Sequence, residues 1–135
     1  MKYLALRTLL ASKGFDWLSN TIVAVALNNY TFDESHESLS EMEIAGATVL
    51  SSVRVTSKSI TNDGWAESRS VTLPVVPQGG PYTLVLFMDS TGRSSGMYPL
   101  VAYTGASGIT TLTNGDVIVR PEDALDDGVG RWFRF

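Results

Sequence analysis

The single histidine, His36, is the first place to look for acid–base or metal chemistry in this sequence. It lies in the polar segment Asp33-Glu34-Ser35-His36-Glu37, whose carboxylates favour the charged form of an imidazole. A histidine in this setting could act as a general base or as a metal ligand. The chain has no cysteine and no second histidine to complete a transition-metal site, however. The pattern therefore favours a solvated loop histidine.

Carboxylates are densest in the segment 122–127, where Glu122-Asp123 and Asp126-Asp127 precede Gly128. Oxygen ligands beside a glycine suit calcium, but the D-x-[DN]-x-[DN]-G spacing of an EF-hand loop is absent. We expect a solvated loop, and the sequence leaves open whether Asp126-Asp127 binds an ion. The alternative among enzymes is a small hydrolase that uses carboxylates of this loop or of the Asp33 region.

The remaining motifs for nucleotide binding and for nucleophilic catalysis are weak. The segment Gly92-Arg93-Ser94-Ser95-Gly96 lacks the lysine and the spacing of a phosphate-binding loop, and we expect no nucleophile elbow in the chain. The sequence therefore predicts no catalytic, cofactor-binding or metal-binding residue and no enzymatic activity.

Aromatic residues allow a second kind of function, the binding of a ligand or a partner. Trp17, Trp65 and Trp132 could serve as stacking platforms for sugars, as in a carbohydrate-binding module. Tryptophan is also typical of protein cores and of protein interfaces. The composition favours core or interface positions for these three side chains.

The two ends of the sequence contain the residues that we predict to bind a partner. The last five residues are Arg131-Trp132-Phe133-Arg134-Phe135, and strand alternation places Phe133 and Phe135 on one face and Trp132 and Arg134 on the other. An end this apolar should be paired in a sheet or docked on a partner. Near the start, Leu6, Leu9 and Leu10 follow the spacing of one helix face. The predicted contact residues are Leu6, Leu9, Leu10, Trp132, Phe133, Arg134 and Phe135.

Composition limits the class of protein further. The chain has 135 residues, 18% of them charged, and a net charge of −4, which disfavours a nucleic-acid binder. Its apolar runs are shorter than the roughly 18–20 residues that span a bilayer, and Arg7 interrupts the only run that resembles a secretory signal. We expect neither nucleic acid nor membrane as a partner.

The predicted elements that carry these residues are one helix followed by short strands. A helix is expected over residues 2–13, ended by Gly14. The apolar runs Thr21–Leu27 and Tyr82–Met88 predict strands covered on both faces. A hairpin is expected around Asn62-Asp63-Gly64, and a second turn at Asn114-Gly115. Further strands are expected at residues 48–56, 58–61, 66–73, 99–103, 109–112, 117–120 and 131–135, with a crossover loop at residues 74–81.

About eight short strands separated by turns indicate one domain over residues 1–135, with a β core from about residue 20 to residue 135. The predicted fold class is mainly β. We expect a single-domain antiparallel β-sandwich or barrel, jelly-roll-like, with a short N-terminal helix.

Several motifs occur in an order that resembles a group of small tailed-bacteriophage proteins. The resemblance runs over nearly the whole chain, although Trp65 and the segment Val76–Pro81 depart from it. The matching segments are Asp16-Trp17 through Leu27, Tyr30 to Glu41, Asn62-Asp63-Gly64, Tyr82 to Asp89, Pro99 to Tyr103, Asn114 to Val117 and Arg131 to Phe135.

This resemblance implies a structural protein of the virion, assembled in the cytoplasm of the host bacterium. A capsid cement or decoration protein fits a compact β domain that only needs a surface complementary to a lattice. A head–tail neck, tail or fibre-adaptor protein fits nearly as well. The implied partners are other virion proteins, either the major capsid protein or neck and tail proteins, together with further copies of this chain.

Overall fold

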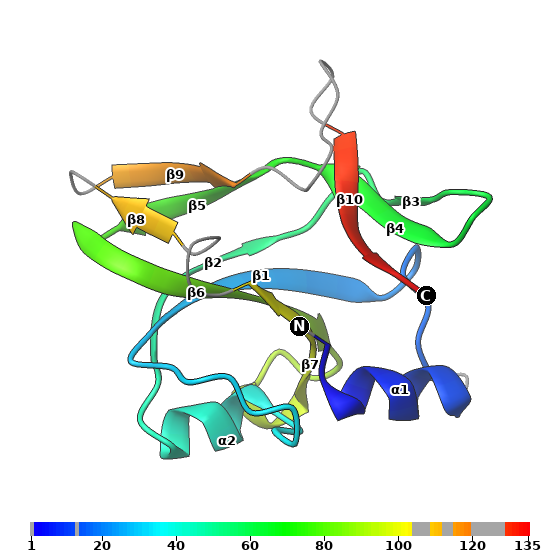
Figure 1. The fold of residues 1–135 in the computed structure, drawn as a ribbon, viewed down its shortest axis with the longest axis horizontal. Helices are drawn as coiled ribbons and strands as arrows, with labels where there is room; N and C mark the ends of the chain where they lie inside the picture. Colours follow the sequence, from blue (N-terminus) through cyan, green and yellow to red (C-terminus); the bar gives the residue numbers. More distant parts are fainter. Residues whose placement is uncertain (1, 13, 104–108, 112–114, 120–128) are drawn as a thin grey trace.

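The computed structural model of the chain describes residues 2–12, 14–103, 109–111, 115–119 and 129–135 and is mainly β (Figure 1). The expected short N-terminal helix is present, and the fold is a sandwich-like arrangement of antiparallel strands. The elements, in chain order, are α1 (Leu4–Ala11), β1 (Thr21–Asn28), α2 (Leu39–Ile44), β2 (Thr48–Arg54), β3 (Ser59–Ile60), β4 (Trp65–Arg69), β5 (Val71–Val76), β6 (Gly79–Asp89), the 3₁₀ helix η1 (Ser94–Gly96), β7 (Met97–Tyr103), β8 (Ile109–Thr111), β9 (Gly115–Val119) and β10 (Val129–Arg134).

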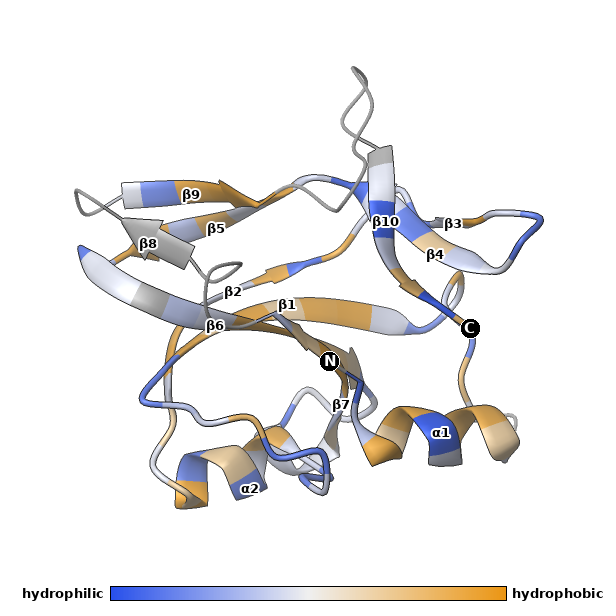
Figure 2. Cartoon of the chain, in the orientation of Figure 1, coloured by the Kyte–Doolittle hydropathy of each residue, from blue (hydrophilic) through white to orange (hydrophobic). Residues whose placement is uncertain are grey.

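A five-stranded sheet forms the middle layer of the molecule. Its order is β2-β1-β6-β7, and β8 pairs with β6 beside this path. In the register of β1 and β6, Ala24 lies opposite Leu86 and Val25 lies opposite Val85. β1 is apolar along most of its length and β6 mainly over residues 84–88 (Figure 2), which suits strands that are covered on both faces. The prediction of two doubly buried strands is confirmed.

Two small sheets cover one face of the middle sheet. One has the order β10-β4-β3 and the other pairs β5 with β9 (Figure 1). They enclose the larger core, to which β1 contributes Ile22, Ala24 and Ala26 and β6 contributes Leu84 and Leu86. The alternate residues of β1 and β6 therefore point to the opposite face.

The opposite face is covered by α1, α2 and the segment that joins β1 to α2 (Figure 1). Val25, Val85 and Phe87 point into this second core, where Tyr3 and Met42 meet them. The six-residue helix α2 has no counterpart among the sequence predictions. Its signal is local, because the Ser38 hydroxyl caps the helix by accepting a hydrogen bond from the backbone N–H of Glu41.

The hairpin predicted around Asn62-Asp63-Gly64 is present between β3 and β4, where Ile60 lies opposite Ala66. The strand expected over residues 66–73 is divided at Ser70 into β4 and β5, which belong to different sheets. The turn expected at Asn114-Gly115 does not join a paired hairpin: β8 pairs with β6 and β9 pairs with β5. Asn114 itself lies outside the described residues.

The crossover loop predicted at residues 74–81 is wrong. Pro74 lies within β5, and Gly79 begins β6. A bulge between Leu73 and Val76 accommodates the proline, and Val75 takes a positive φ of 48° there. The backbone N–H of Val75 donates to the Asp116 carboxylate at 3.0 Å. The bulge lets β5 continue past a proline that cannot donate to a strand ladder.

Candidate functional site

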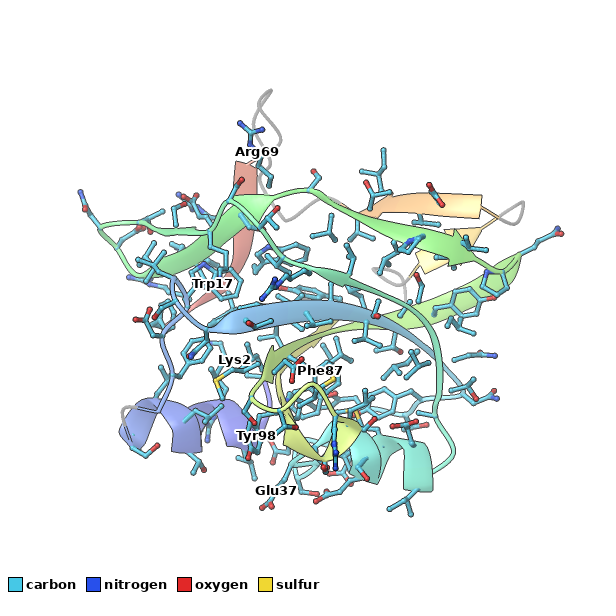
Figure 3. The ribbon with its side chains drawn as sticks, turned by 180° about the vertical axis from the view of Figure 1, so that it is seen from behind. Lys2, Trp17, Glu37, Arg69, Phe87 and Tyr98 are labelled. Atoms are coloured by element: carbon cyan, nitrogen blue, oxygen red, sulfur yellow. The ribbon has the colours of Figure 1, made fainter. Side chains whose placement is uncertain are left out.

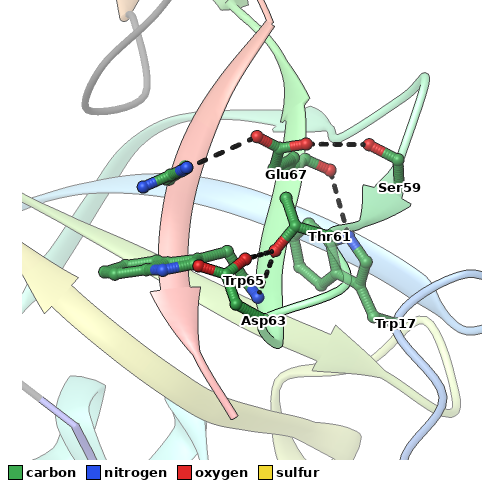
Figure 4. Close-up of polar contacts among 7 residues, drawn as sticks. Trp17, Ser59, Thr61, Asp63, Trp65 and Glu67 are labelled. Carbon is green, nitrogen blue, oxygen red and sulfur yellow. Dashed lines mark hydrogen bonds and ion pairs between the residues drawn. The ribbon is translucent and has the colours of Figure 1, made fainter.

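The C-terminal segment is held in the fold by the strand β4. Arg131 lies opposite Glu67 in the register of β10 and β4, and its Nε is 3.9 Å from a Glu67 carboxylate oxygen. The same guanidinium lies over the ring of Trp65, 5.3 Å from its centre. Glu67 also uses its backbone carbonyl to accept a hydrogen bond from the Trp17 indole (Figure 4). Of the two expectations for the C-terminal segment, pairing in a sheet or docking on a partner, the structure shows the pairing in a sheet.

Trp132 and Phe133 belong to the core, so the prediction that they contact a partner is wrong. They are 5% and 3% exposed. A bulge between Arg131 and Phe133 interrupts the strand alternation, which allows two consecutive side chains to be buried. The Trp132 indole donates to the Ser68 hydroxyl at 2.6 Å, and the Tyr103 hydroxyl donates to the Trp132 carbonyl. These two side chains stabilise the fold and are not available as anchors.

The three leucines predicted to form one contact face lie in three different environments. Leu6 is 1% exposed and belongs to the larger core, so it cannot contact a partner. Leu9 is half-buried against the same core. Leu10 is 37% exposed. Of the three, Leu10 is the one that solvent reaches, and it is still more than half covered.

Exposed residues of the two predicted segments meet at one surface, which we call the terminal surface and define by Lys2, Arg134 and Phe135. The Lys2 ammonium donates to the Arg134 carbonyl at 2.7 Å. The Phe135 ring lies 5.9 Å from Phe15, next to α1, and 5.2 Å from Phe133. Figure 1 shows the end of β10 above α1. The chain therefore brings residues more than 120 positions apart onto one face.

Phe135 is the exposed aromatic group of the terminal surface. It is 42% exposed, and it contacts Phe133 on the same side of β10, as the alternation of this strand predicted. An exposed phenylalanine beside two cations has the composition of a protein interface, where aromatic residues and arginine are enriched. No protein-family model, no curated protein and no solved structure matches the chain. The site is therefore interpreted from its own geometry.

The charges of the terminal surface are positive in a chain with a net charge of −4. Arg134 is oriented by a hydrogen bond from its Nε to the Asp63 carbonyl at 2.9 Å. The Thr61 hydroxyl donates to the Asp63 carboxylate at 2.5 Å (Figure 4), and this hydrogen bond holds the pKa of Asp63 below its ordinary value. The nearby guanidinium groups of Arg131 and Arg134 act in the same direction. The hairpin tip thus fixes one cation of the surface in place.

His36 has a structural role in the second core. Its ring is half-buried rather than fully solvated, and its Nδ1 lies 3.1 Å from the Tyr30 hydroxyl. The Tyr30 hydroxyl also lies 2.6 Å from the hydroxyl of Tyr3, which is fully buried. Burial raises the pKa of Tyr3 well above its ordinary range, so its hydroxyl stays protonated. This chain of polar groups attaches the segment after β1 to the start of α1.

One catalytic motif is present in its spacing alone. The segment Gly92–Gly96 matches G-x-S-x-G, so the expectation of no nucleophile elbow is wrong about the spacing. Its context is not that of a nucleophile elbow, since the segment is a turn with a 3₁₀ helix between the antiparallel strands β6 and β7. In the described part of the chain Ser94 has no hydrogen bond to a histidine. The motif match alone does not indicate a serine nucleophile.

The other candidate residues are not gathered into a site. Trp17 and Trp132 are buried, as the core interpretation predicted, and the half-buried Trp65 ring contacts Arg131. Glu122, Asp123, Asp126 and Asp127 lie outside the described residues. Within the described ranges no three His, Cys, Asp or Glu side chains come together as a metal ion would require. No helix in these ranges is long and apolar enough to cross a membrane.

Proposed function

We propose that this chain is a non-enzymatic structural protein of a tailed-bacteriophage particle, which binds the particle and stabilises it. A capsid cement or decoration protein is the role that we favour, and a neck, tail or fibre-adaptor protein is the alternative. The order of motifs described for the sequence supports the proposal. So does the β-rich fold, with its short N-terminal helix.

The terminal surface is the observation that carries the proposal. It combines an exposed phenylalanine and two cations on a part of the fold that is held by strand pairing. β10 is fixed by its pairing with β4, and Phe135 rests on Phe133 of the core. Rigid aromatic and arginine side chains contribute most of the binding energy in many protein interfaces. The surface therefore suits attachment to another protein.

Attachment to a symmetric particle needs only a modest contact from each copy. A capsid or tail repeats the same binding site many times, and copies that also touch one another are held by several contacts at once. An anchor of three residues is small for a stable one-to-one complex, which commonly buries about 800 Å² per partner. Repetition of the contact compensates for its small area.

The direct test is to analyse purified particles of the phage whose genome carries this sequence. Quantitative mass spectrometry should find the chain in tens to hundreds of copies, and cryo-electron microscopy should place it on the capsid lattice. Density on the tail axis or at the neck would select the alternative role. Absence of the chain from purified particles would exclude both.

A second test addresses the terminal surface itself. The variant Phe135→Ser with Arg134→Ala should fold, since both side chains are exposed, and should be incorporated at least about tenfold less. The control is Ile118→Ser, which changes an exposed apolar residue (66% exposed) on β9. Equal incorporation of the two variants and the wild-type chain would show that another surface binds the particle.

A further inference from the structure

A pocket of about 410 Å³ opens between α1, the segment that precedes α2, and the strand β7. This volume lies within the range of small-molecule sites, about 300–1,000 Å³. Figure 3 shows Tyr98 and Glu37 between the two helices. The lining residues are Leu4, Ala5, Thr8, Leu9, Ser35, Glu37 and Tyr98.

The walls of the pocket are mostly apolar, and two polar groups in it have no partner among the described residues of the protein. Leu4, Leu9 and the Tyr98 ring supply apolar surface. The Ser35 hydroxyl is already used, because it donates to the Asp33 carboxylate at 2.6 Å. Neither the Glu37 carboxylate nor the Tyr98 hydroxyl has a hydrogen-bond or ion-pair partner among the described residues. An apolar pocket with a few convergent polar groups is the usual form of a ligand site.

The segment that supplies Ser35 and Glu37 to the pocket is acidic. Residues 33–43 contain five carboxylates, at positions 33, 34, 37, 41 and 43, and neither lysine nor arginine. Among the described residues that line the pocket, Glu37 is the only ionisable side chain apart from the Tyr98 phenol. A ligand that enters with a positive charge would neutralise this carboxylate. An anionic ligand would meet a like charge, which is unfavourable at short range.

Two sets of contacts join the acidic segment to the start of α1, the two walls that face β7. The backbone N–H of Leu4 donates to the Glu34 carbonyl at 2.9 Å, which ties the acidic segment to the start of α1. The hydroxyls of Tyr3 and Tyr30 and the ring of His36 form a second connection between the same two segments. Because the walls are fixed before binding, little of the binding free energy is lost in ordering them.

We propose that this pocket binds an organic cation, an ammonium or guanidinium group on an apolar stem. Glu37 is the counter-ion, the Tyr98 ring provides cation–π contact and its hydroxyl a hydrogen-bond acceptor, and Leu4 and Leu9 contact the stem. The cation comes either from a free amine or from a lysine or arginine side chain of a partner protein. The proposal uses residues outside the terminal surface and does not depend on a role in a virion.

The test is a titration of the ¹⁵N-labelled full chain, followed by two-dimensional NMR. The probes are n-butylammonium, Nα-acetyl-lysine amide and Nα-acetyl-arginine amide, and their controls are n-butanol and butyrate, which have a similar stem without the positive charge. We expect saturable shifts at the backbone amides of Leu4, Thr8 and Ser35 with the cations only. Added salt should weaken binding, because Glu37 is exposed.

Two variants assign the binding to the proposed groups. Glu37→Gln keeps the shape of the side chain and should raise the Kd about tenfold, as expected for loss of one charge-assisted contact. Tyr98→Leu removes the ring and should raise the Kd about fivefold. The matched control Glu43→Gln removes another exposed carboxylate of the acidic segment, outside the pocket lining, and should leave the Kd within twofold.

Some outcomes identify the source of the cation, and others overturn the proposal. Tighter binding of butylammonium than of the two amino-acid amides indicates a free amine, and the reverse order indicates a side chain of a partner. The proposal is overturned if no cation causes saturable shifts at concentrations up to about 10 mM, which would detect even a complex with a Kd of about 1 mM. It is also overturned if n-butanol or butyrate binds as tightly, or if Glu43→Gln weakens binding as much as Glu37→Gln. Incorporation into particles has no bearing on any of these readings.

Discussion

Replacement of Trp132 by alanine tests whether the C-terminal strand is part of the core or a free anchor. The side chain is 5% exposed, its indole donates to Ser68 at 2.6 Å, and its ring centre lies 5.8 Å from that of Tyr103. Truncation of a buried tryptophan costs about 3–5 kcal/mol in free energy of unfolding, because a cavity remains. The lost hydrogen bond is included in that range and accounts for about 1 kcal/mol of it.

The assay is urea unfolding of Trp132→Ala followed by far-ultraviolet circular dichroism. A domain of this size has a free energy of unfolding of about 5–15 kcal/mol, so a loss of about 4 kcal/mol is a large fraction of it. Phe135→Ala is the matched control, since its ring is 42% exposed, and we expect it to cost less than about 1 kcal/mol. A Trp132→Ala protein within about 1 kcal/mol of the wild type would refute the placement of β10 in the core.

The hydrogen bond can be separated from the cavity by a double-mutant cycle. Trp132→Phe keeps an aromatic ring and loses the N–H donor, and Ser68→Ala removes the acceptor, which is fully buried. The two changes together should cost about 1 kcal/mol less than the sum of the single changes. Strict additivity would mean that the Trp132–Ser68 contact does not stabilise the fold.

Three further predictions concern other parts of the structure. Tyr30→Phe should lower the free energy of unfolding by about 1–2 kcal/mol, because the buried Tyr3 hydroxyl loses its partner. The control Tyr98→Phe, whose hydroxyl has no described partner, should change the free energy of unfolding by less than about 0.5 kcal/mol. Equal losses for the two variants in urea unfolding would contradict the prediction. Val75→Asn should raise the free energy of unfolding by about 1 kcal/mol, because a β-branched residue at a φ of 48° is strained and asparagine tolerates this conformation. An unchanged or lower urea midpoint would argue against the strain. The pKa values of Asp63 and Asp33 lie below their values in the unfolded chain, above all because the Thr61 and Ser35 side chains hydrogen-bond to the two carboxylates. The two carboxylates therefore stabilise the fold above about pH 4, and this stabilisation is lost as the pH falls through their lower pKa values in the folded state. Asp63→Asn should therefore make the decline of the urea midpoint between pH 5 and pH 2 shallower, and a decline as steep as that of the wild type would show that Asp63 does not contribute.

Burial could be predicted for the strands that have apolar residues at successive positions, because such strands must be covered on both faces. Thr21–Leu27 and Tyr82–Met88 are apolar at nearly every position, and they form the two central strands β1 and β6. A strand with one covered face gives a weaker signal, and its partner is not encoded locally. The Asn114-Gly115 pair indicates a turn, yet the strands around it pair with β6 and β5, because long-range packing decides the pairing.

Local irregularities account for most of the errors. The bulge between Arg131 and Phe133 turns Trp132 inward, and strict alternation could not predict it. The bulge at Val75 keeps Pro74 in a strand where the rule for proline predicts a break. A bulge adds one residue to one strand only, so it depends on the register with a partner far away in the sequence. Composition and periodicity carry no information about that register.

The candidate sites were predictable only in part, for the same reason. The two segments predicted to bind a partner do meet at one surface, although Leu6, Trp132 and Phe133 are buried beneath it. The unpaired carboxylate and the aromatic ring of the pocket, Glu37 and Tyr98, come from a loop and from a strand about 60 residues later. No spacing rule connects such residues, and the acidic composition of residues 33–43 is the one local signal that preceded them.

The helix α1 shows why a single apolar pattern can serve several purposes. Its leucines at positions 6, 9 and 10 have the spacing of one face, but that face meets the larger core, a pocket and solvent. Leu6 fills the larger core, Leu9 contacts both that core and the pocket, and Leu10 reaches solvent. A helix of eight residues in water is too short to be stable alone, so packing must hold it. The burial of Leu6 is therefore the condition under which Leu9 can line the pocket and Leu10 can present itself to a partner.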